Sequence, residues 1–495
     1  MLNDILAFLK LHWEAIGLTI LYFFTAMAAY KALMETRSSG KTLAYLLLLF
    51  FLPGLGLIVY MTVGVNRRIN RIYSRKWVSN IRLSQRLQEY LQQESRAVLL
   101  EHADLVANKN SIAHLLFKDT LSPVTDNNYA ELLLNGEQKF PLMLQVLRSA
   151  EHHIHLEYYI FEEDTIGREI MEVLKDKARN GVNVRFIYDD FGSSDINRRF
   201  LKEMREAGVE VFPFYRVRIL ANRLNYRNHR KIVVVDGHTG FIGGINVADK
   251  YINDPRYNPT KKTAMYWRDT HLMIKGHAVH SLQFIFMSDW NFCAEANLPI
   301  THQFFPDCAQ PGDSLVQIAS SGPDSNRSAI MLSYLAAINQ AERAVYITTP
   351  YFIPNDSIFD ALRQAALSGK DVRLLLPGDK TDSRLVAMAS ESYFEDLLSC
   401  GVRIFRYQKG FVHAKTMVVD ENLSVVGTAN MDIRSFDFNF EVNAFVYSRE
   451  VNHELTQSFL FDQVNSVEVE LQAWLLRSKW RKVFEALVRL VSPLL

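Results

Sequence analysis

The chain has 495 residues and is almost neutral, with 55 Lys and Arg against 54 Asp and Glu, and 48% of its residues are hydrophobic. This length is enough for two or three domains with a substantial core. The balanced charge gives no general support for nucleic-acid binding. The cysteines form no CxxC pair and have no His-rich neighbours, so neither a zinc site nor a disulfide framework is indicated; they are Cys293, Cys308 and Cys400.

The first 65 residues are unlike those of a globular domain. Ala15–Tyr30 carries no charge, and the apolar segment extends to Met34 if the Lys31 side chain reaches the lipid headgroups. Thr42–Val65 also carries no charge and is long enough to cross about 30 Å of hydrocarbon. A cleaved signal peptide is the alternative for the first segment, but the stretch Lys31–Arg37 after it lacks a clear small-x-small cleavage site, and the second apolar segment follows at once. The sequence therefore predicts a transmembrane hairpin over residues 1–65.

The second apolar segment contains Pro53, Gly54 and Gly56, which predict a kink. The basic residues that follow it outnumber those of the connecting loop, and they are Arg67, Arg68, Arg71, Arg75 and Lys76. This excess favours an inner-membrane protein with its catalytic part in the cytoplasm. Residues 66–110 are expected to form a juxtamembrane helical linker.

Two stretches of the chain are near copies of each other. NHRKIVVVDGHTGFIGGIN runs from Asn228 to Asn246, and VHAKTMVVDENLSVVGTAN runs from Val412 to Asn430. Each is typical of a strand, a tight turn and a returning strand. Each contains an HxKxxxxD motif, and the candidate catalytic residues are His229, Lys231, Asp236, His413, Lys415 and Asp420.

The geometry of a hairpin brings three functional groups of each copy together. His and Lys lie two apart and share a strand face, and an Asn lies opposite the His because the two are equidistant from the turn. An imidazole, an ammonium and an amide on one patch can attack a phosphate and hold its oxygens. The predicted phosphate-binding residues are Lys231, Asn246, Lys415 and Asn430. These donors can stabilise the phosphate without a metal or another cofactor.

The HxKxxxxD motif occurs twice, and each copy is followed by a glycine-bearing strand and Asn. This pattern resembles that of the phospholipase D superfamily. The two apolar segments and the stretches beginning at Trp267, Gly276 and Asn430 resemble those of bacterial cardiolipin synthases. The resemblance covers nearly the whole chain. It implies that the two hairpins face each other, with His229 as the nucleophile and His413 as the general acid and base. Spacing alone does not distinguish the two histidines.

Each histidine needs a partner that fixes its tautomer. Asp236 and Asp420 follow their histidines at an odd spacing, so they point to the other face and are interpreted as anchors of the hairpins. Later carboxylates, at a position where the superfamily also has them, are better candidates. The hypothesis pairs Asp269 with His229 and Glu441 with His413. The second copy has Thr428 where the first has Gly244 and Glu421 where it has Gly237, and neither change is expected to affect activity.

Strand and helix patterns repeat along both halves of the chain. They predict an α/β fold of mixed sheets flanked by helices. The expected domains are two duplicated phospholipase D-like domains, 111–300 and 301–466, related by a pseudo-twofold axis. Residues 467–495 are expected to form an amphipathic helix, lying on the membrane or packed on the core, with one apolar face made by Trp480, Val483, Phe484, Leu487 and Val491.

The resemblance implies a lipid transferase. One phosphatidylglycerol would donate its phosphatidyl group to His229, glycerol would leave, and the hydroxyl of a second phosphatidylglycerol would attack to give cardiolipin. A membrane-anchored phospholipase D-type hydrolase or nuclease is the alternative, and a lipid-binding scaffold is the third. The expected partners are phosphatidylglycerol and membrane lipids, without nucleic acid, and an oligomer is compatible with the sequence.

Overall fold

The computed structural model describes most of the chain, and its described residues are 2–35, 39–63, 92–214, 226–257, 265–308, 312–325 and 327–491. Two compact units are present: an N-terminal helical unit and a large α/β unit. Residues 66–91 of the predicted linker lie outside the described residues, and so do the basic residues that were used for orientation. The described part of the linker is largely helical.

The N-terminal unit contains one helix long enough to span a membrane. Helix α1 covers Leu2–Glu35, and its part His12–Met34 has a mean hydropathy of 1.5. Among the described residues this is the one candidate span by length and composition. It supports membrane association.

The second apolar segment forms two short helices, α2 (Ser39–Phe51, 13 residues) and α3 (Pro53–Val63, 11 residues). The ring centroids of Tyr45 and Tyr60 lie 5.4 Å apart, although these residues would be about 22 Å apart on a straight helix. A Cβ on Gly56 would lie 2.7 Å from the carbonyl oxygen of Leu48, so only glycine permits this close approach. The predicted kink is confirmed, and it folds α3 back along α2. Each piece reaches only about 16–20 Å, so the two-helix membrane hairpin is not confirmed.

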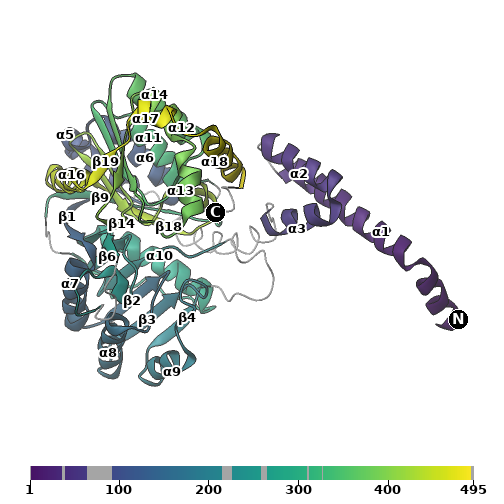
Figure 1. Cartoon of the computed structure of the whole chain (residues 1–495). Coiled ribbons are helices and arrows are strands. Elements are labelled where there is room, and N and C mark those ends of the chain that lie inside the picture. The colour runs from purple at the N-terminus through teal and green to yellow at the C-terminus, as the bar shows by residue number, and fades with distance from the viewer. Residues whose placement is uncertain are drawn as a thin grey trace. The chain divides into compact units, whose positions relative to one another are not determined.

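The α/β unit is built on one 15-stranded mixed sheet (Figure 1). Its strands are β1 (Thr125–Leu134), β2 (His153–Tyr158), β3 (Asn183–Tyr188), β4 (Glu210–Pro213), β5 (Ile232–Val235), β6 (Thr239–Gly243), β8 (Thr270–Lys275), β9 (Ser314–Ser321), β10 (Ala344–Thr348), β12 (Asp371–Pro377), β13 (Arg403–Tyr407), β15 (Thr416–Val419), β16 (Leu423–Gly427), β18 (Glu441–Tyr447) and β19 (Ser466–Glu468). The mixed α/β class predicted from the sequence is confirmed.

The strand order reads alike from the middle of the sheet toward both edges. One side runs β1-β8-β6-β5-β2-β3-β4, and the other runs β9-β18-β16-β15-β10-β12-β13-β19. On each side the hairpin, β5–β6 or β15–β16, is antiparallel. The strands beyond it, β2-β3-β4 or β10-β12-β13, are parallel to one another. The sides join where β1 pairs with β9. The sequence predicts more than one sheet, whereas a single continuous sheet passes through both predicted domains.

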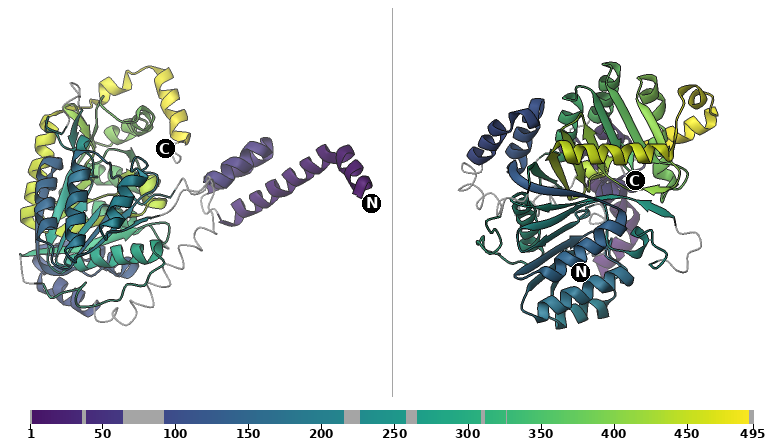
Figure 2. Two further views of the ribbon diagram at one scale, coloured as in Figure 1. Left: turned by 90° about the horizontal axis from the view of Figure 1, so that it is seen from below. Right: turned by 90° about the vertical axis from the view of Figure 1, so that its left-hand side faces the viewer.

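Helices cover both faces of this sheet (Figures 1 and 2). Alternate residues of a strand contact different layers: Val233 and Val235 pack in one buried cluster, while Ile232 and Val234 pack in another. The helices are α5 (Ala103–Val106), α6 (Asn110–Thr120), α7 (Asn135–Ser149), α8 (Thr165–Arg179), α9 (Arg198–Glu206), α10 (Ala278–Cys293), α11 (Ala329–Asn339), α12 (Asp356–Leu367), α13 (Arg384–Glu391), α14 (Phe394–Ser399), α15 (Ile433–Asp437), α16 (Arg449–Val464), α17 (Leu471–Leu475) and α18 (Lys479–Val491). Burial on both faces explains why β5 is a continuous apolar run.

Candidate functional site

The two near copies fold as antiparallel hairpins, β5–β6 and β15–β16, as the sequence predicts. The first turn residues, Asp236 and Asp420, both have a φ of 52°. Such left-handed backbone favours Asp among non-glycine residues. Gly237 continues with a φ of 72°, whereas Glu421 at the same place is not left-handed. The hairpins therefore differ in turn type, as their sequences indicate.

The segment before each hairpin pairs with a strand of the other half of the chain. Asn228 forms a bridge to Phe440, and the backbone N–H of His229 donates to the carbonyl of Phe440 at 2.9 Å. In the same way β14 (Gly410–Val412) pairs with β7 (Tyr266–Arg268), and the N–H of His413 donates to the carbonyl of Arg268 at 2.7 Å. Each histidine is therefore held beside the residue that precedes a carboxylate of the opposite half.

This crossing reverses the hypothesised pairing of histidines and carboxylates. His229 Nδ1 lies 3.0 Å from Glu441 Oε2, and His413 Nδ1 lies 2.7 Å from Asp269 Oδ2. The sequence hypothesis placed Asp269 with His229 and Glu441 with His413, and it is wrong. Proximity along the chain was a poor guide because the residues before β5 and β15 leave their own sheet half and pair across the molecule.

Each carboxylate is fixed by further hydrogen bonds. Thr428 Oγ1 donates to Glu441 Oε2, and Asn439 Nδ2 donates to Glu441 Oε1 at 3.2 Å. The backbone N–H of Thr270 donates to Asp269 Oδ1 at 2.7 Å. All three carboxylate-to-donor contacts involve buried groups. Both carboxylates are therefore held rigidly against their histidines.

The exchange of Gly244 for Thr428 between the copies touches the site directly. A Cβ on Gly244 would lie 2.1 Å from Asp269 Oδ1, so this position cannot hold a side chain. Thr428 instead donates its hydroxyl to Glu441, and its carbonyl oxygen lies 3.1 Å from His229 Nδ1. The expectation that this difference is neutral did not include its contact with the carboxylates. The Gly-to-Thr difference was the one signal in the sequence that the two carboxylates have different surroundings.

Each lysine donates to the carbonyl oxygen of its own histidine, and Lys415 also contacts the imidazole ring. Lys231 Nζ donates to the carbonyl oxygen of His229 at 2.7 Å. Lys415 Nζ lies 2.9 Å from Nδ1 and 3.0 Å from Nε2 of His413. Because Nδ1 of each ring faces a carboxylate, we assign the ring proton to Nδ1. Nε2 of His413 then accepts from Lys415, whereas Nε2 of His229 has no hydrogen bond to the described residues.

The asparagines and several aromatic rings complete the walls. Asn246 Oδ1 accepts from the N–H of Ile160 at 3.1 Å, and the buried Oδ1 of Asn430 has no partner among the described residues. The ring of Tyr159 lies 4.9 Å from that of His229. Trp267 and Tyr351 lie 5.2 Å and 6.4 Å from His413. None of the three was predicted as a site residue, although the stretch beginning at Trp267 is one of those that carry the family resemblance.

Burial dominates the electrostatics of the site. It lowers the pKa of Lys231 to about 7 and the pKa of Lys415 to about 8. Burial and Lys415 lower the pKa of His413 to about 3, and burial also lowers the pKa of His229. Lys415 acts on His229 and Lys231 acts on His413, so the groups of the two halves lie within electrostatic range of each other.

The two carboxylates remain ionised despite their burial. Burial alone would raise the pKa of Asp269, but His413 and Lys415 bring it below its usual value. His229 and Lys231 do the same for the pKa of Glu441. At neutral pH the site therefore contains two neutral imidazoles that donate to carboxylates, beside lysines whose pKa values lie near neutrality.

Asp236 and Asp420 do not contact His229 or His413. Asp236 accepts from the backbone N–H groups of Glu151, His152 and His153 at 2.8–2.9 Å. Asp420 accepts in the same way from the N–H groups of residues 342–344, and the buried Lys109 Nζ donates to it at 2.7 Å. As the strand alternation predicts, both tie a hairpin turn to the neighbouring chain.

Replacing Asp236 with alanine is expected to destabilise the protein by roughly 2–4 kcal/mol, because three backbone N–H groups lose their acceptor. Thermal unfolding of the purified enzyme measures this loss. Asp236→Asn keeps one acceptor oxygen and should lose less. An unchanged unfolding temperature together with a lost kcat would show that Asp236 is catalytic instead.

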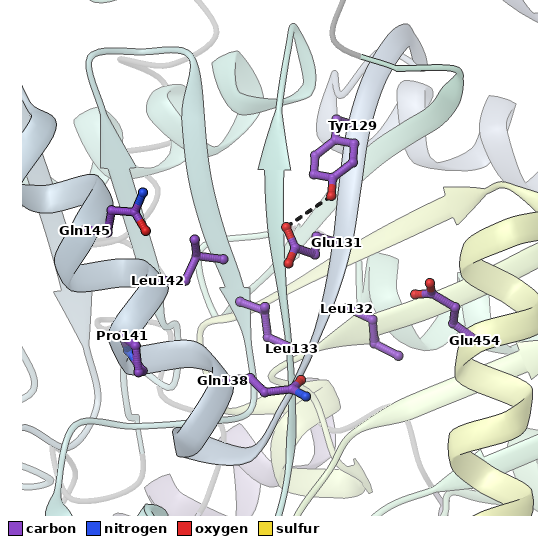
Figure 3. A pocket seen from close by; sticks show the side chains of 9 residues that line it. All are labelled: Tyr129, Glu131, Leu132, Leu133, Gln138, Pro141, Leu142, Gln145 and Glu454. Carbon is purple, nitrogen blue, oxygen red and sulfur yellow. Dashed lines mark hydrogen bonds between the residues drawn. The ribbon is translucent and has the colours of Figure 1, made fainter.

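Other candidate sites lie away from these residues. A hollow of about 620 Å³ is lined by β1, α7 and α16, and Figure 3 shows its nine lining residues, none of which belongs to either motif. Glu101, His102 and Asp126 bring three potential metal-ligand atoms within 4.8 Å of one another. Neither of these sites contains a candidate catalytic residue.

The sequence of the chain matches two family descriptions. "Cardiolipin synthase, PLD-like domain" matches residues 143–258 and again residues 334–462, and "Phospholipase_D-nuclease N-terminal" matches residues 20–64. The major cardiolipin synthase of Bacillus subtilis is 40% identical over 466 residues, covering 93% of this chain and 95% of that protein. Cardiolipin synthase 2 of Bacillus anthracis is 40% identical over 470 residues, covering 93% and 88%. The chain belongs to the cardiolipin synthase family.

Solved structures agree with the fold of this family member. Phosphatidylserine synthase from Haemophilus influenzae superposes with a TM-score of 0.57 at 14% identity, covering 78% of this chain and all of that chain. At this identity the likeness concerns the fold alone. The family membership agrees with the resemblance read from the HxKxxxxD motifs.

Proposed function

We propose that the enzyme is a phosphatidyltransferase that makes cardiolipin from two molecules of phosphatidylglycerol. Relatives at about 40% identity over nearly the full chain are cardiolipin synthases, which supports this activity. The observation that supports the mechanism best is the pair of crossed histidine–carboxylate contacts, His229–Glu441 and His413–Asp269. Each half of the chain supplies one histidine, together with the carboxylate that contacts the histidine of the other half.

The same observations support two duplicated phospholipase D-like domains, 111–300 and 301–466, related by a pseudo-twofold axis. The strand order repeats from the middle of the sheet outward, and one family description matches once in each range. The cross-half hydrogen bonds of His229 and His413 are also equivalent. Lys415 acts electrostatically on His229 and Lys231 acts on His413, which supports a shared site in which both imidazoles act on one phosphorus atom.

In the first step Nε2 of His229 attacks the phosphorus of a phosphatidylglycerol. The bond from phosphorus to the glycerol headgroup oxygen breaks, and the protonated His413 gives its Nε2 proton to that oxygen. Glycerol leaves, and the phosphatidyl group remains on His229. The open Nε2 of His229 supports its role as nucleophile, and Glu441 stabilises the positive charge that forms on its ring.

Binding of the substrate favours protonation of His413. Alone, the ring has a pKa of about 3, but a phosphodiester anion beside it favours the charged form. Lys415 Nζ lies 3.0 Å from Nε2 and can supply the proton. The contact of Lys415 with the ring of His413, which Lys231 does not make with the ring of His229, supports the assignment of His413 as acid and base.

In the second step the neutral His413 takes the proton of the terminal hydroxyl of a second phosphatidylglycerol. The hydroxyl oxygen attacks phosphorus, the P–N bond breaks, and His229 returns to its starting state. His413 then returns the proton to Lys415, which completes the cycle. Throughout both steps the non-bridging oxygens are held by Lys231, Lys415, Asn246 and Asn430. All four side chains are buried, which strengthens these contacts.

Products distinguish the proposal from its alternatives. Purified full-length enzyme is incubated in vesicles of phosphatidylglycerol, and the lipids and glycerol are resolved by mass. Cardiolipin with an equal amount of glycerol is the expected result. Phosphatidic acid in place of cardiolipin would identify a hydrolase, and no turnover would identify a lipid-binding scaffold.

The alkaline limb of the pH profile should report the two lysines. Lys231 and Lys415 are cationic below their pKa values of about 7 and 8 and lose their charge above them. Both histidines have lowered pKa values and are neutral throughout this range. Because both charges are needed, we expect kcat/KM to fall by about tenfold per pH unit between about pH 7 and 8 and by about a hundredfold per unit above about pH 8. A profile that stays flat to about pH 9.5, for enzyme that regains full activity at pH 7, would contradict this assignment.

We also propose that the enzyme is anchored in the bacterial inner membrane with its catalytic unit in the cytoplasm. The apolar helix His12–Met34 supports the anchor, and the excess of basic residues after Val65 supports the orientation. Multi-pass topology would require that α2 and α3 also cross the bilayer. Cysteine accessibility on the two sides of the membrane tests the orientation.

A further inference from the structure

The C-terminal helix α18 docks on the α/β unit through its charged side. Arg481 Nη2 donates to Glu391 at 2.7 Å, and Lys482 Nζ donates to Glu395 at 2.7 Å. Glu485 has a side chain only 3% exposed and accepts from Arg477 at 2.7 Å. One apolar side chain joins this contact, since Val488 packs in a cluster with residues of β11 (Phe352–Ile353) and α13.

The opposite side of α18 is apolar and exposed. We call it the α18 stripe, and its residues with their exposed fractions are Trp480 (83%), Val483 (50%), Phe484 (49%), Leu487 (56%) and Leu490 (76%). The side chain of Val491, which the sequence placed on this face, lies outside the described residues. A surface helix normally buries its apolar side and exposes its charges. Here the arrangement is inverted, so the apolar side has no protein contact that would account for it among the described residues.

We propose that the α18 stripe lies in the lipid–water interface of an anionic membrane. Arg477, Arg481 and Lys482 are paired with Glu485, Glu391 and Glu395 of the protein. Lys479 directly precedes Trp480, the first residue of the stripe, and a basic residue at this place is attracted to an anionic lipid surface. Trp480 stands at one end of the stripe, and tryptophan is enriched at the headgroup level of membranes. The same chain contains an apolar helix able to span a bilayer.

The sequence left open whether this helix contacts the membrane or the core. Both contacts fit on one helix because they use different sides: the charged side bonds to α13 and α14, and the stripe faces outward. The core contact holds the helix at a fixed angle. A helix fixed in this way presents a rigid apolar face rather than folding on the membrane.

The position of α18 connects the membrane to the reaction site. Helix α18 packs on α13, which begins at Arg384, two residues after Asp382. The carboxylate of Asp382 accepts a hydrogen bond from the hydroxyl of Tyr351, whose ring lies 6.4 Å from His413. The stripe would therefore hold the second histidine close to the lipid headgroups. This consequence, unlike the membrane contact itself, rests on the proposed function.

Depth measurement tests the contact without relying on activity. In full-length enzyme with Cys293, Cys308 and Cys400 changed to serine, Leu487→Cys is labelled with an environment-sensitive fluorophore and reconstituted in phosphatidylglycerol vesicles containing nitroxide lipids. Leu367→Cys, at an exposed apolar residue on α12 (70% exposed), is the matched control. We expect quenching at 487 to be about five times that at 367, because only 487 would lie in the interface. Equal quenching at both positions would overturn the inference.

A second measurement asks whether the contact serves the reaction. The variant Phe484→Asp/Leu487→Asp should form cardiolipin about tenfold more slowly from vesicles, because the charges oppose insertion, and within twofold of the normal rate from dispersed short-chain phosphatidylglycerol. Leu367→Asp should leave both rates unchanged. An equal loss on both substrates, or a change in the oligomeric mass of the enzyme in detergent, would assign the stripe to protein packing and overturn the inference. Quenching at 487 in an enzyme that makes no cardiolipin would refute the proposed function and leave the membrane contact standing.

Discussion

Replacing His229 with alanine is expected to lower cardiolipin formation by about 10⁴-fold or more, because no other group in the site can accept the phosphatidyl moiety. Release of labelled glycerol and formation of cardiolipin should fall together, since both require the covalent intermediate. His413→Ala should cost about as much, and the double variant should be scarcely worse than either single one. Non-additivity of this kind is expected of residues that act as one unit.

The control for this experiment is His238→Ala. His238 lies in the turn of the first hairpin, is exposed, and contacts Thr239 rather than the site. Its loss should leave the rate unchanged, which would show that the effect of His229→Ala is not a general effect of removing a histidine from the hairpin. If His229→Ala retained activity within tenfold of the normal enzyme, the double-displacement account would be wrong.

The second large effect concerns the crossed carboxylates. Glu441→Gln and Asp269→Asn should each lower kcat by about 10²–10³-fold, since a neutral amide neither fixes the ring tautomer nor stabilises the imidazolium. Both carboxylates are fully buried, so water cannot replace them. The fold should persist, because each amide matches the carboxylate in shape.

The crossing can be tested separately from the importance of the carboxylates. In a His413→Ala background, Asp269 has lost its partner, so adding Asp269→Asn should change the slow release of glycerol by less than about twofold. Adding Glu441→Gln should slow that release further by about tenfold, because Glu441 contacts His229. A roughly tenfold effect of Asp269→Asn with little effect of Glu441→Gln would instead support the pairing of His229 with Asp269. Near-wild-type unfolding temperatures for all variants are the required control.

Local sequence was sufficient for the hairpins and for the direction of their side chains. The alternation of a strand places His and Lys together and turns Asp236 and Asp420 away, and the structure has both aspartates on backbone N–H groups. The mixed α/β class also follows from the alternation of strand and helix patterns. These features depend on contacts between residues that are close along the chain.

Long-range pairing was not accessible in the same way. The contact of His229 with Glu441 depends on Asn228 pairing with Phe440, more than 200 residues away, and no periodicity encodes that pairing. The absence of a single helix over Thr42–Val65 has another cause. Proline and two glycines predict a kink, but its sharpness depends on the contact of Gly56 with Leu48. The inverted docking of α18 likewise depends on Glu391 and Glu395, which belong to other helices.

Trapping the covalent intermediate tests the central claim most directly, that two imidazoles from opposite halves act on one phosphorus atom. The His413→Ala enzyme is mixed with phosphatidylglycerol, quenched in alkali and digested, and the histidine-containing peptides are analysed by mass spectrometry. The account predicts a phosphatidyl group on His229, with one glycerol released per adduct. An adduct on another residue, or glycerol release with no adduct, would contradict it.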